Sequence, residues 1–435
     1  MAGLVTAYLL HRDPANDSAS VSIPNALNTT DRVDLPMRAF AGGYYSNLRA
    51  MYDHLGIRYH SQPFLFEFAK AQSGPARRGG SRGDSSYFIH ASNLHKIRPP
   101  KPSAVATTPY LLEILYLLAC YTWFSICCFL VAPRVIPQES YEGLSETLDQ
   151  YLQRIRLPDY FVTYYLLPLL SGVTTCPHQA LLRFPASDLI EYKRRTHGAP
   201  HYTVSNGVGT VQDRLVEGIE YELCAMVSAV QLQEKGIKLS WTKVDGSRES
   251  RHEGIFDEVV LAVAPDIVGK IFEPLRTHMS KIPTAIVESV VHMDRSMLGV
   301  GPIQKTGNID NRDAQLICLQ TTSEGSRQTE SIHVQPCGAI VTTCPFSLID
   351  PSLTICSAKF TRVLRSPESR NVVNSIFGDT PDNYGNEKTR SLWKNGDDNV
   401  WLAGGWCWDG MVLLEGCVVS ATRIADGFGV DVPWR

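Results

Sequence analysis

Apolar and polar positions follow two patterns along the chain, and the change from one to the other falls near residue 200. Upstream, apolar side chains recur at helical spacing, as in 44–57, where Gly56 follows the periodic run as a stop signal. Downstream, shorter β-branched or alternating runs, such as 256–266 and 284–294, are typical of strands. The last segment, 399–430, predicts an apolar strand, a glycine- and tryptophan-rich loop and a helix. The chain is therefore expected to be of mixed α/β class.

The chain opens on an apolar helical pattern, MAGLVTAYLL, with nothing before it that could cap a helix. Leu4, Ala7 and Leu10 lie at helical spacing. A secretory signal peptide is not predicted, because the segment lacks a positively charged start and polar residues at 11–13 end its apolar run. We therefore expect a cytoplasmic protein.

One segment, 110–131, is apolar enough to cross a membrane. Glu113 is its only charged residue, and a helix of this length would reach about 33 Å. Basic residues precede it and would hold that side in the cytoplasm. Two interpretations are open at this point: a transmembrane anchor, or a helix or helix pair buried in a large core.

The composition fits a globular protein of 435 residues, which at roughly 100–200 residues per domain indicates two or three domains. The net charge of −3 shows no basic surplus, so a nucleic-acid partner is not expected. Residues 71–86 are rich in Gly, Ser and Arg and predict a flexible, solvated loop. The 11 cysteines include no C-x-x-C pair, so no metal site is predicted and most thiols are expected to be reduced core residues.

The first chemical signal comes from the tail. The predicted strand VWLAGG ends in Gly404 and Gly405, which would let a ligand or a backbone approach closely. A helix then begins near Glu415, and its free N–H groups would form an anion site. The competing interpretation is a plain strand–turn–helix with tight packing.

Four segments, 33–57, 202–215, 256–266 and 400–428, together resemble the flavin-containing amine oxidase-like superfamily, in its chain order. The tail is similar to the family's C-terminal flavin-binding segment, and FDEVVLAVAPD to its Phe-Asp-x-Val-Val-x-Ala strand. Asn206 stands where the first glycine of the family's Gly-Gly-x-x-x-Leu turn usually sits. The group most similar in these motifs is the predicted FAD/NAD(P)-binding proteins of fungi and bacteria.

The resemblance implies an α/β fold in which a Rossmann-like FAD/NAD(P)-binding domain is interleaved with an α+β substrate domain. The cofactor domain would comprise 1–60, 203–268 and 396–435, and the substrate or cap domain 87–202 and 269–395. A membrane span at 110–131 would place the two ends of the cofactor domain on opposite sides of the bilayer. A buried helix or helix pair lining an apolar substrate cavity is therefore expected, with contact to one membrane face as the alternative.

Two residues would face the adenosine half of FAD. Gly3 would be the third glycine of G-x-G-x-x-G, facing the pyrophosphate, or else a glycine that only packs a helix. Val227 resembles the strand residue whose backbone meets the adenine. The first strand, the first two glycines and the ribose-binding acid of the motif are not found in the sequence. This is interpreted as a start at an internal methionine or missing exons, or as a loss of tight flavin binding.

Five residues would surround the flavin half, by the same resemblance. Arg38 corresponds to the arginine beside the flavin. Gly404 and Gly405 would approach the ribityl-phosphate region. Glu415 and Gly416 would begin the helix that points at the flavin.

The substrate side departs from the family. Glu288 occupies the position where many amine oxidases carry a lysine near the flavin. Trp406 and Trp408 are candidates for the aromatic pair that flanks the substrate, with packing as the equal alternative. His292 follows an apolar strand and is interpreted as structural. No catalytic dyad is found, which suits hydride transfer to a flavin because the cofactor supplies the chemistry.

The sequence thus predicts an FAD-dependent, amine oxidase-like oxidoreductase that oxidises an apolar or amphipathic small molecule by hydride transfer. The alternative is a truncated or non-catalytic, membrane-associated remnant of the same fold that acts through protein contacts. The substrate, the electron acceptor and the oligomeric state are not predicted.

Overall fold

The computed structural model describes residues 1–10, 20–24, 30–35, 39–71, 86–92, 99–102, 104–138, 141–246, 248–298, 314–322, 327–378 and 393–435. Arg38 and nearly all of the 71–86 loop lie outside these described residues, so their predicted roles stay predictions.

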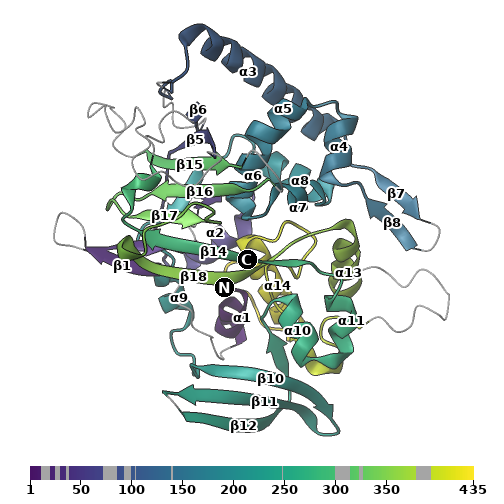
Figure 1. Cartoon of the computed structure of the whole chain (residues 1–435). Helices are drawn as coiled ribbons and strands as arrows, with labels where there is room; N and C mark the ends of the chain where they lie inside the picture. Colours follow the sequence, from purple (N-terminus) through teal and green to yellow (C-terminus); the bar gives the residue numbers. More distant parts are fainter. Residues whose placement is uncertain are drawn as a thin grey trace.

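The larger half of the molecule is built on a sheet of seven strands, in the order β18-β14-β17-β16-β15-β5-β6 (Figure 1). Only β5 and β15 pair in parallel, and every other neighbouring pair is antiparallel. The strands, in chain order, are β5 (Phe64–Lys70), β6 (Ser86–Ala91), β14 (Thr284–His292), β15 (Gln315–Thr321), β16 (Thr329–Val334), β17 (Ile340–Thr343) and β18 (Thr354–Val363). The predicted strand at 284–294 is therefore confirmed as β14.

Helices from the middle of the chain pack beside this sheet, and α6 contacts both β15 and β16. They are α4 (Leu148–Arg154), α5 (Asp159–Phe161), α6 (Leu167–Thr174), α7 (His178–Leu182) and α8 (Ala186–Thr196), with a π-helical turn at Val162–Leu166. The start of α4 is fixed by a capping box, in which Thr147 and Gln150 satisfy each other's backbone N–H groups.

The smaller half centres on two parallel strands, β13 (Val259–Leu261) and β19 (Val400–Leu402), which lie far apart in the sequence. Two helices from the ends of the chain, α1 (Ala2–Leu10) and α14 (Leu414–Gly427), pack against them, while α2 (Ser46–His54) contacts α14 and α9 (Gly209–Leu215) contacts α1. Figure 1 shows α1 and α14 close together, and the two helices are in extensive contact. The helices predicted for the opening MAGLVTAYLL and for 44–57 are thus confirmed as α1 and α2.

A second core covers the same strand pair with α10 (Pro265–Ile271), α11 (Arg276–Met279) and α13 (Pro367–Phe377). Val372 and Val373 of α13 pack with Val400 and Leu402 of β19, although α13 comes from the range predicted for the substrate domain. The domain boundaries stay a prediction, but this core joins residues from both predicted domains.

Small sheets complete the fold. An antiparallel sheet of β10 (Ala225–Gln233), β11 (Gly236–Asp245) and β12 (Arg248–Phe256) projects from the end of the molecule that is opposite α3 in Figure 1. The others are β3-β9-β4 and the pairs β1-β2 and β7-β8. Their bounds are β1 (Ser20–Pro24), β2 (Thr30–Asp34), β3 (Ala39–Ala41), β4 (Tyr59–Ser61), β7 (Val135–Gln138), β8 (Tyr141–Ser145) and β9 (His201–Val204).

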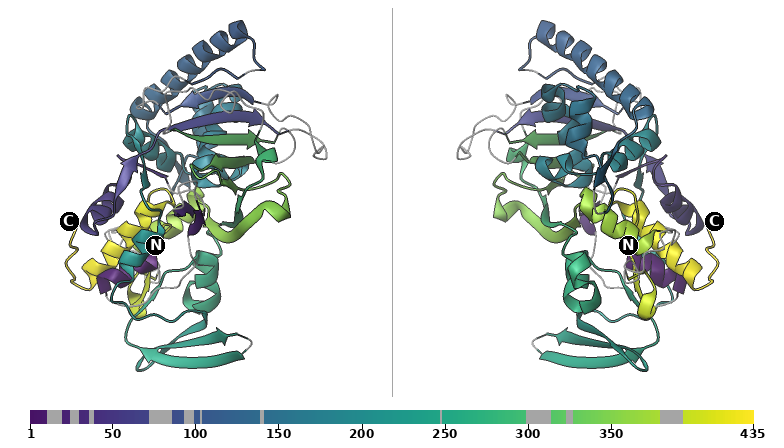
Figure 2. Two further views of the ribbon diagram at one scale, coloured as in Figure 1. Left: turned by 90° about the vertical axis from the view of Figure 1, so that its left-hand side faces the viewer. Right: turned by 90° about the vertical axis from the view of Figure 1, so that its right-hand side faces the viewer.

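The apolar segment forms one helix, α3 (Thr107–Leu130), along the outer edge of the molecule (Figures 1 and 2). By length and composition it is the one helix of the described residues that could cross a membrane. Only 28% of its apolar 18-residue stretch is buried in the protein, however. The expected buried helix or helix pair is therefore wrong. One face does pack on the body, where Trp123 Nε1 donates to the carbonyl of Ile155 and the Tyr151 hydroxyl donates to that of Cys127.

Candidate functional site

A cavity of about 370 Å³ lies where the two parallel strands end, a size within the range of small-molecule sites. Ala262, Val263 and Ala264 follow β13 and line it, as do Ala403 to Trp406, which follow β19. Parallel strands present their carboxyl ends at one edge, where ligands of open α/β folds bind. The segments FDEVVLAVAPD and VWLAGG were expected to end at a ligand site, and both do end at a cavity.

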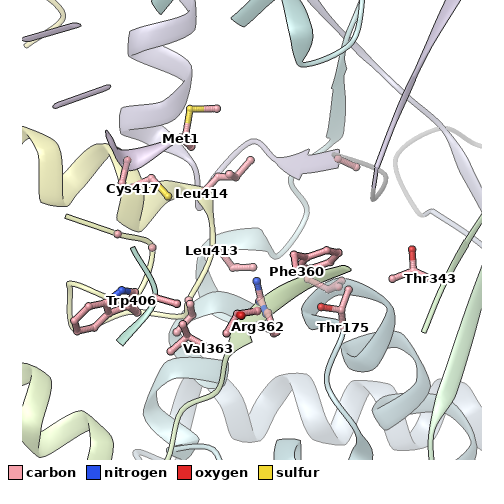
Figure 3. A pocket seen from close by; sticks show the side chains of 18 of the residues that line it. Met1, Thr175, Thr343, Phe360, Arg362, Val363, Trp406, Leu413, Leu414 and Cys417 are labelled. Atoms are coloured by element: carbon pink, nitrogen blue, oxygen red, sulfur yellow. The ribbon is translucent and has the colours of Figure 1, made fainter. Parts of the chain in front are cut away.

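The other walls come from both halves of the fold (Figure 3). Leu413, Leu414 and Cys417 bring the N-terminal end of α14 to the cavity, and Met1 and Ala2 bring the start of α1. The large sheet contributes residues of β16, β17 and β18, and α6 contributes Gly172 and Val173. The cavity therefore lies between the predicted cofactor and substrate sides.

The cavity has polar as well as apolar walls, and Arg362 is the single charged side chain among the described residues that line it. Its Nε is buried and has no hydrogen-bond partner. His333 is neutral near pH 7, because burial lowers its pKa to about 3. Its two ring nitrogens are engaged by Gln315 at 2.7 Å and Gln335 at 2.8 Å.

The two candidate tryptophans have different positions. Trp406 lines the cavity, and its Nε1 donates to the carbonyl of Val263 at 3.2 Å. Trp408 does not line the cavity; its Nε1 donates to the carbonyl of Met411 at 2.9 Å and its ring meets that of Tyr44 edge to face. Trp408 is thus a packing residue within its loop, while Trp406 stays a pocket candidate.

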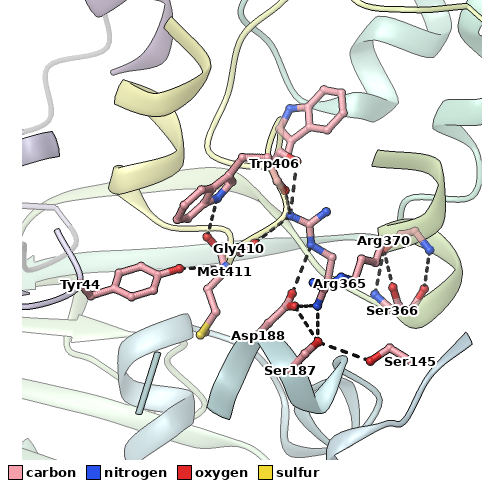
Figure 4. A network of polar contacts seen from close by, with 12 residues as sticks. Tyr44, Ser145, Ser187, Asp188, Arg365, Ser366, Arg370, Trp406, Gly410 and Met411 are labelled. Carbon is pink, nitrogen blue, oxygen red and sulfur yellow. Dashed lines mark hydrogen bonds and ion pairs between the residues drawn. The ribbon is translucent and has the colours of Figure 1, made fainter. Parts of the chain in front are cut away.

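A buried charge network holds the tryptophan loop, 404–413, in place (Figure 4). Arg365, which follows β18, donates to the carbonyls of Trp408 at 2.9 Å, Gly410 at 3.0 Å and Trp406 at 3.4 Å. Its guanidinium pairs with the fully buried carboxylate of Asp188 on α8, which also binds Arg370. Burial raises the pKa of Asp188, and the two guanidiniums oppose that shift.

The glycines of the tail are required by the protein's own packing. A Cβ on Gly405 would lie 2.9 Å from the carbonyl oxygen of Leu413, and one on Gly404 would lie 2.8 Å from the ring of Trp406. Gly416 does not line the cavity, and a Cβ there would lie 2.3 Å from Trp408 Nε1. Gly404 and Gly405 do line the cavity, so the lack of a side chain there serves the packing of the protein and leaves room for a ligand. At Gly416 it serves packing alone.

Glu415 binds protein rather than facing the cavity. Its buried carboxylate accepts the backbone N–H groups of Asn47 at 2.9 Å and Leu48 at 3.0 Å, and the side chain of Asn47 at 2.7 Å. These are the free donors of the first turn of α2, so Glu415 caps that helix from a distant part of the chain. It thereby fixes α14 against α2.

The two residues predicted to face the adenosine half lie in different settings. Gly3 packs α1 closely on the end of β13, because a Cβ there would lie 2.8 Å from Cβ of Ala262. Close helix–strand packing is the role of the third glycine in dinucleotide-binding folds, and it also suits the simpler packing interpretation. Val227 is exposed in β10 opposite Trp241 and does not line the cavity, so its role stays a prediction.

Glu288 lies outside the cavity. It sits in β14 opposite Lys359 of β18, and the two side chains form a partly exposed ion pair at 3.9 Å. The cation of the cavity is instead Arg362, farther along β18.

Arg362, Asp188 and Arg365 were not predicted, because no motif marks them and their partners are distant in sequence. His292 is buried in β14 and bonds Thr342 at 2.8 Å, as a structural residue would.

The described residues fit a flavin dinucleotide in two respects. At the carboxyl ends of the two strands, four of the residues that line the cavity have small side chains or none, namely Ala262, Ala403, Gly404 and Gly405. A ligand could therefore approach the backbone closely there. The N-terminal end of α14 also faces the cavity, and its partial positive charge, which no N-cap side chain covers with a hydrogen bond, suits an anion such as a phosphate.

No protein-family model and no curated protein matches the sequence. Solved structures match over the full length. Cyclohexylamine oxidase from Brevibacterium oxydans is 11% identical, with a TM-score of 0.50 over 98% of this chain and 97% of that chain. A putrescine oxidase variant is 12% identical, with a TM-score of 0.50 over 98% and 96%. An oxidoreductase from Methanosarcina mazei is 9% identical, with a TM-score of 0.52 over 98% of both chains. The chain therefore has the mixed α/β fold of the flavin-dependent amine oxidases over nearly its whole length.

Proposed function

We propose that the protein is an FAD-dependent oxidoreductase that oxidises an apolar or amphipathic small molecule. The observation that carries this proposal is the cavity at the ends of β13 and β19, placed within the fold of flavin amine oxidases. The strand ends and Leu414 and Cys417 at the start of α14 would hold FAD, which when bound supplies the hydride acceptor.

The chain's own residues would orient the substrate and exclude water. Phe360, Val341, Val412 and Leu413 give the cavity apolar walls. Arg365 keeps Trp406 at the wall by holding its loop through three carbonyls. These walls support an apolar or amphipathic substrate.

The first test is the visible absorption spectrum of the purified protein, before and after denaturation. We expect a flavin band that is released on denaturation. Cys417→Trp, which fills the cavity at the start of α14, should lower the flavin content several-fold. Arg423→Trp, on the outward face of the same helix, should retain it. Double substitution of Gly404 and Gly405 by valine is less informative, because both side chains would strike the loop itself.

A colourless protein that stays colourless with added FAD would overturn the proposal. The alternative, a non-catalytic remnant that acts through protein contacts, would then be favoured.

We further propose that the protein lies on a membrane surface through α3. The exposed face of this helix is apolar, and its residues include Leu112, Leu115 and Leu118. Lys193, whose ammonium donates to the Tyr121 hydroxyl, and the exposed Arg134 would meet anionic headgroups beside it. Because the other face of α3 is bonded to the body, an orientation in the membrane plane is favoured over a span.

A further inference from the structure

Arg362 carries a charge into the cavity that nothing in the described part of the protein neutralises. It lies near the end of β18 and lines the cavity with Phe360 and Val363 (Figure 3). No ion pair to its guanidinium is found among the described residues, and its buried Nε–H has no acceptor. The residue as a whole is partly buried, and a donor that is shielded from water without an acceptor is destabilising, so an anionic ligand that accepts from this Nε–H would stabilise the site.

The titratable neighbours of Arg362 supply no negative charge, although the Cys176 thiol forms a hydrogen bond with the Arg362 side chain. No Asp, Glu or Lys side chain is among the described residues lining the cavity. Burial raises the pKa of the Cys176 thiol and of the Tyr45 phenol, so both are neutral near pH 7. Glu330 is buried in β16, but it alternates with the cavity residues Ser331 and His333 and accepts from Ser347 Oγ at 2.7 Å.

The rest of the cavity combines apolar side chains, such as those of Phe360 and Leu413, with hydroxyl groups such as those of Thr175 and Thr343. A ligand that satisfies Arg362 must therefore combine one anionic group with an apolar body. A guanidinium presents N–H donors in a planar fork, which matches the two oxygens of a carboxylate.

We propose that Arg362 binds the carboxylate of an amphipathic substrate, so that the protein acts on a carboxylic acid rather than on a simple ammonium compound. This inference rests on the proposed function, since it takes the cavity to be the substrate site. The cation disfavours a second positive charge beside it. Substrate choice would then differ from that of the two structural neighbours that are named for amines.

The test is isothermal titration calorimetry of the full-length protein, as purified and after loading with FAD, against octanoate, octylamine and octanol near pH 7. These ligands share an apolar body and differ in the charge of the head group. Octanoate should bind roughly 10- to 100-fold more tightly than either of the others. Arg362→Met should abolish that preference, and Arg362→Lys should retain part of it.

Arg214→Met, which removes an exposed arginine of α9, is the matched control and should leave the preference unchanged. Equal affinity for the three ligands in the unaltered protein would overturn the proposal, as would an intact preference in Arg362→Met. A loss of flavin from Arg362→Met without a change in ligand preference would assign Arg362 to the cofactor instead. If no flavin binds, the proposed function fails, while the calorimetry still decides the charge preference.

Discussion

At the scale of single residues, the cavity depends on side chains that never touch it. Arg365 is buried behind the tryptophan loop and holds three of its carbonyls, and Asp188 holds Arg365. Backbone carbonyls of a buried loop need donors, because they have no access to water. One guanidinium supplies these donors and so determines where Trp406 lies.

Replacing Arg365 with methionine should therefore lower the free energy of unfolding by about 3 kcal/mol, since buried carbonyls lose their donor and Asp188 loses one of its two cations. Urea denaturation measures the loss. Arg423→Met removes a surface pair with Asp409 and should cost less than about 1 kcal/mol. Similar losses in the two variants would contradict the role given to Arg365.

Glu415 should behave as a capping residue. Glu415→Ala leaves the N–H groups of Asn47 and Leu48 without their acceptor, so we expect a loss of about 2 kcal/mol and weaker protection of the first turn of α2. Hydrogen exchange of these amides is the measurement. Glu415→Gln, which keeps one acceptor oxygen, should lose less. Unchanged exchange in the alanine variant would show that the contact does not stabilise α2.

Glycines were easier to predict than charges at this scale. Gly404 and Gly405 stood out because two glycines at the end of a strand signal a close approach of some kind, but the sequence does not say whether the approaching atoms belong to a ligand or to the protein. Arg362 has no such signal. It is one of many arginines, and only the folded sheet places it in a cavity.

At the scale of elements, α3 is unusual because its apolar residues cover the side that faces away from the protein. Leu112 and Leu115 are each 63% exposed, and the helix continues as an apolar surface toward Phe129 and Leu130. An apolar surface of this kind marks a site of interaction.

Replacing Leu112, Leu115 and Leu118 together by serine should reduce co-sedimentation with anionic liposomes by about tenfold or more, because three apolar side chains would no longer enter the lipid. The fold should be unaffected, since these side chains have few protein neighbours. The control is Ile286→Ser with Leu348→Ser, at positions that are 70% and 82% exposed elsewhere. Membrane binding that survives the triple change would exclude this face.

Strands and helices with a clear apolar period, such as α2, β13, β19 and α14, were predicted from sequence. The exposure of α3 was not predicted, because hydrophobicity shows only that a helix avoids water. Whether protein or lipid covers it depends on how much surface the rest of the chain offers. The core that joins α13 to β19 was missed for a related reason, since it depends on contacts between distant segments.

At the scale of the whole molecule, the core between the large sheet and its helices contains histidines that must stay neutral. His178 on α7 is buried and bonds Thr329 at 2.8 Å, and burial lowers its pKa to about 4. His333 on β16 is buried too, with its pKa lowered to about 3. In the unfolded chain both rings would titrate near their ordinary value of 6.5. Below that pH the unfolded state binds more protons, so acid favours unfolding.

The stability that these rings contribute is therefore complete above about pH 6.5 and is lost as the pH falls toward their folded values. Between pH 7 and pH 5 the loss should be about 2 kcal/mol for each ring. Urea denaturation at the two pH values measures it. His333→Gln retains a polar group for Gln315 and Gln335, and should remove about half of the combined loss. His252→Gln, at an exposed histidine of β12, should leave the loss unchanged. If His333→Gln is as sensitive to acid as the unaltered protein, the burial of this ring does not couple folding to pH.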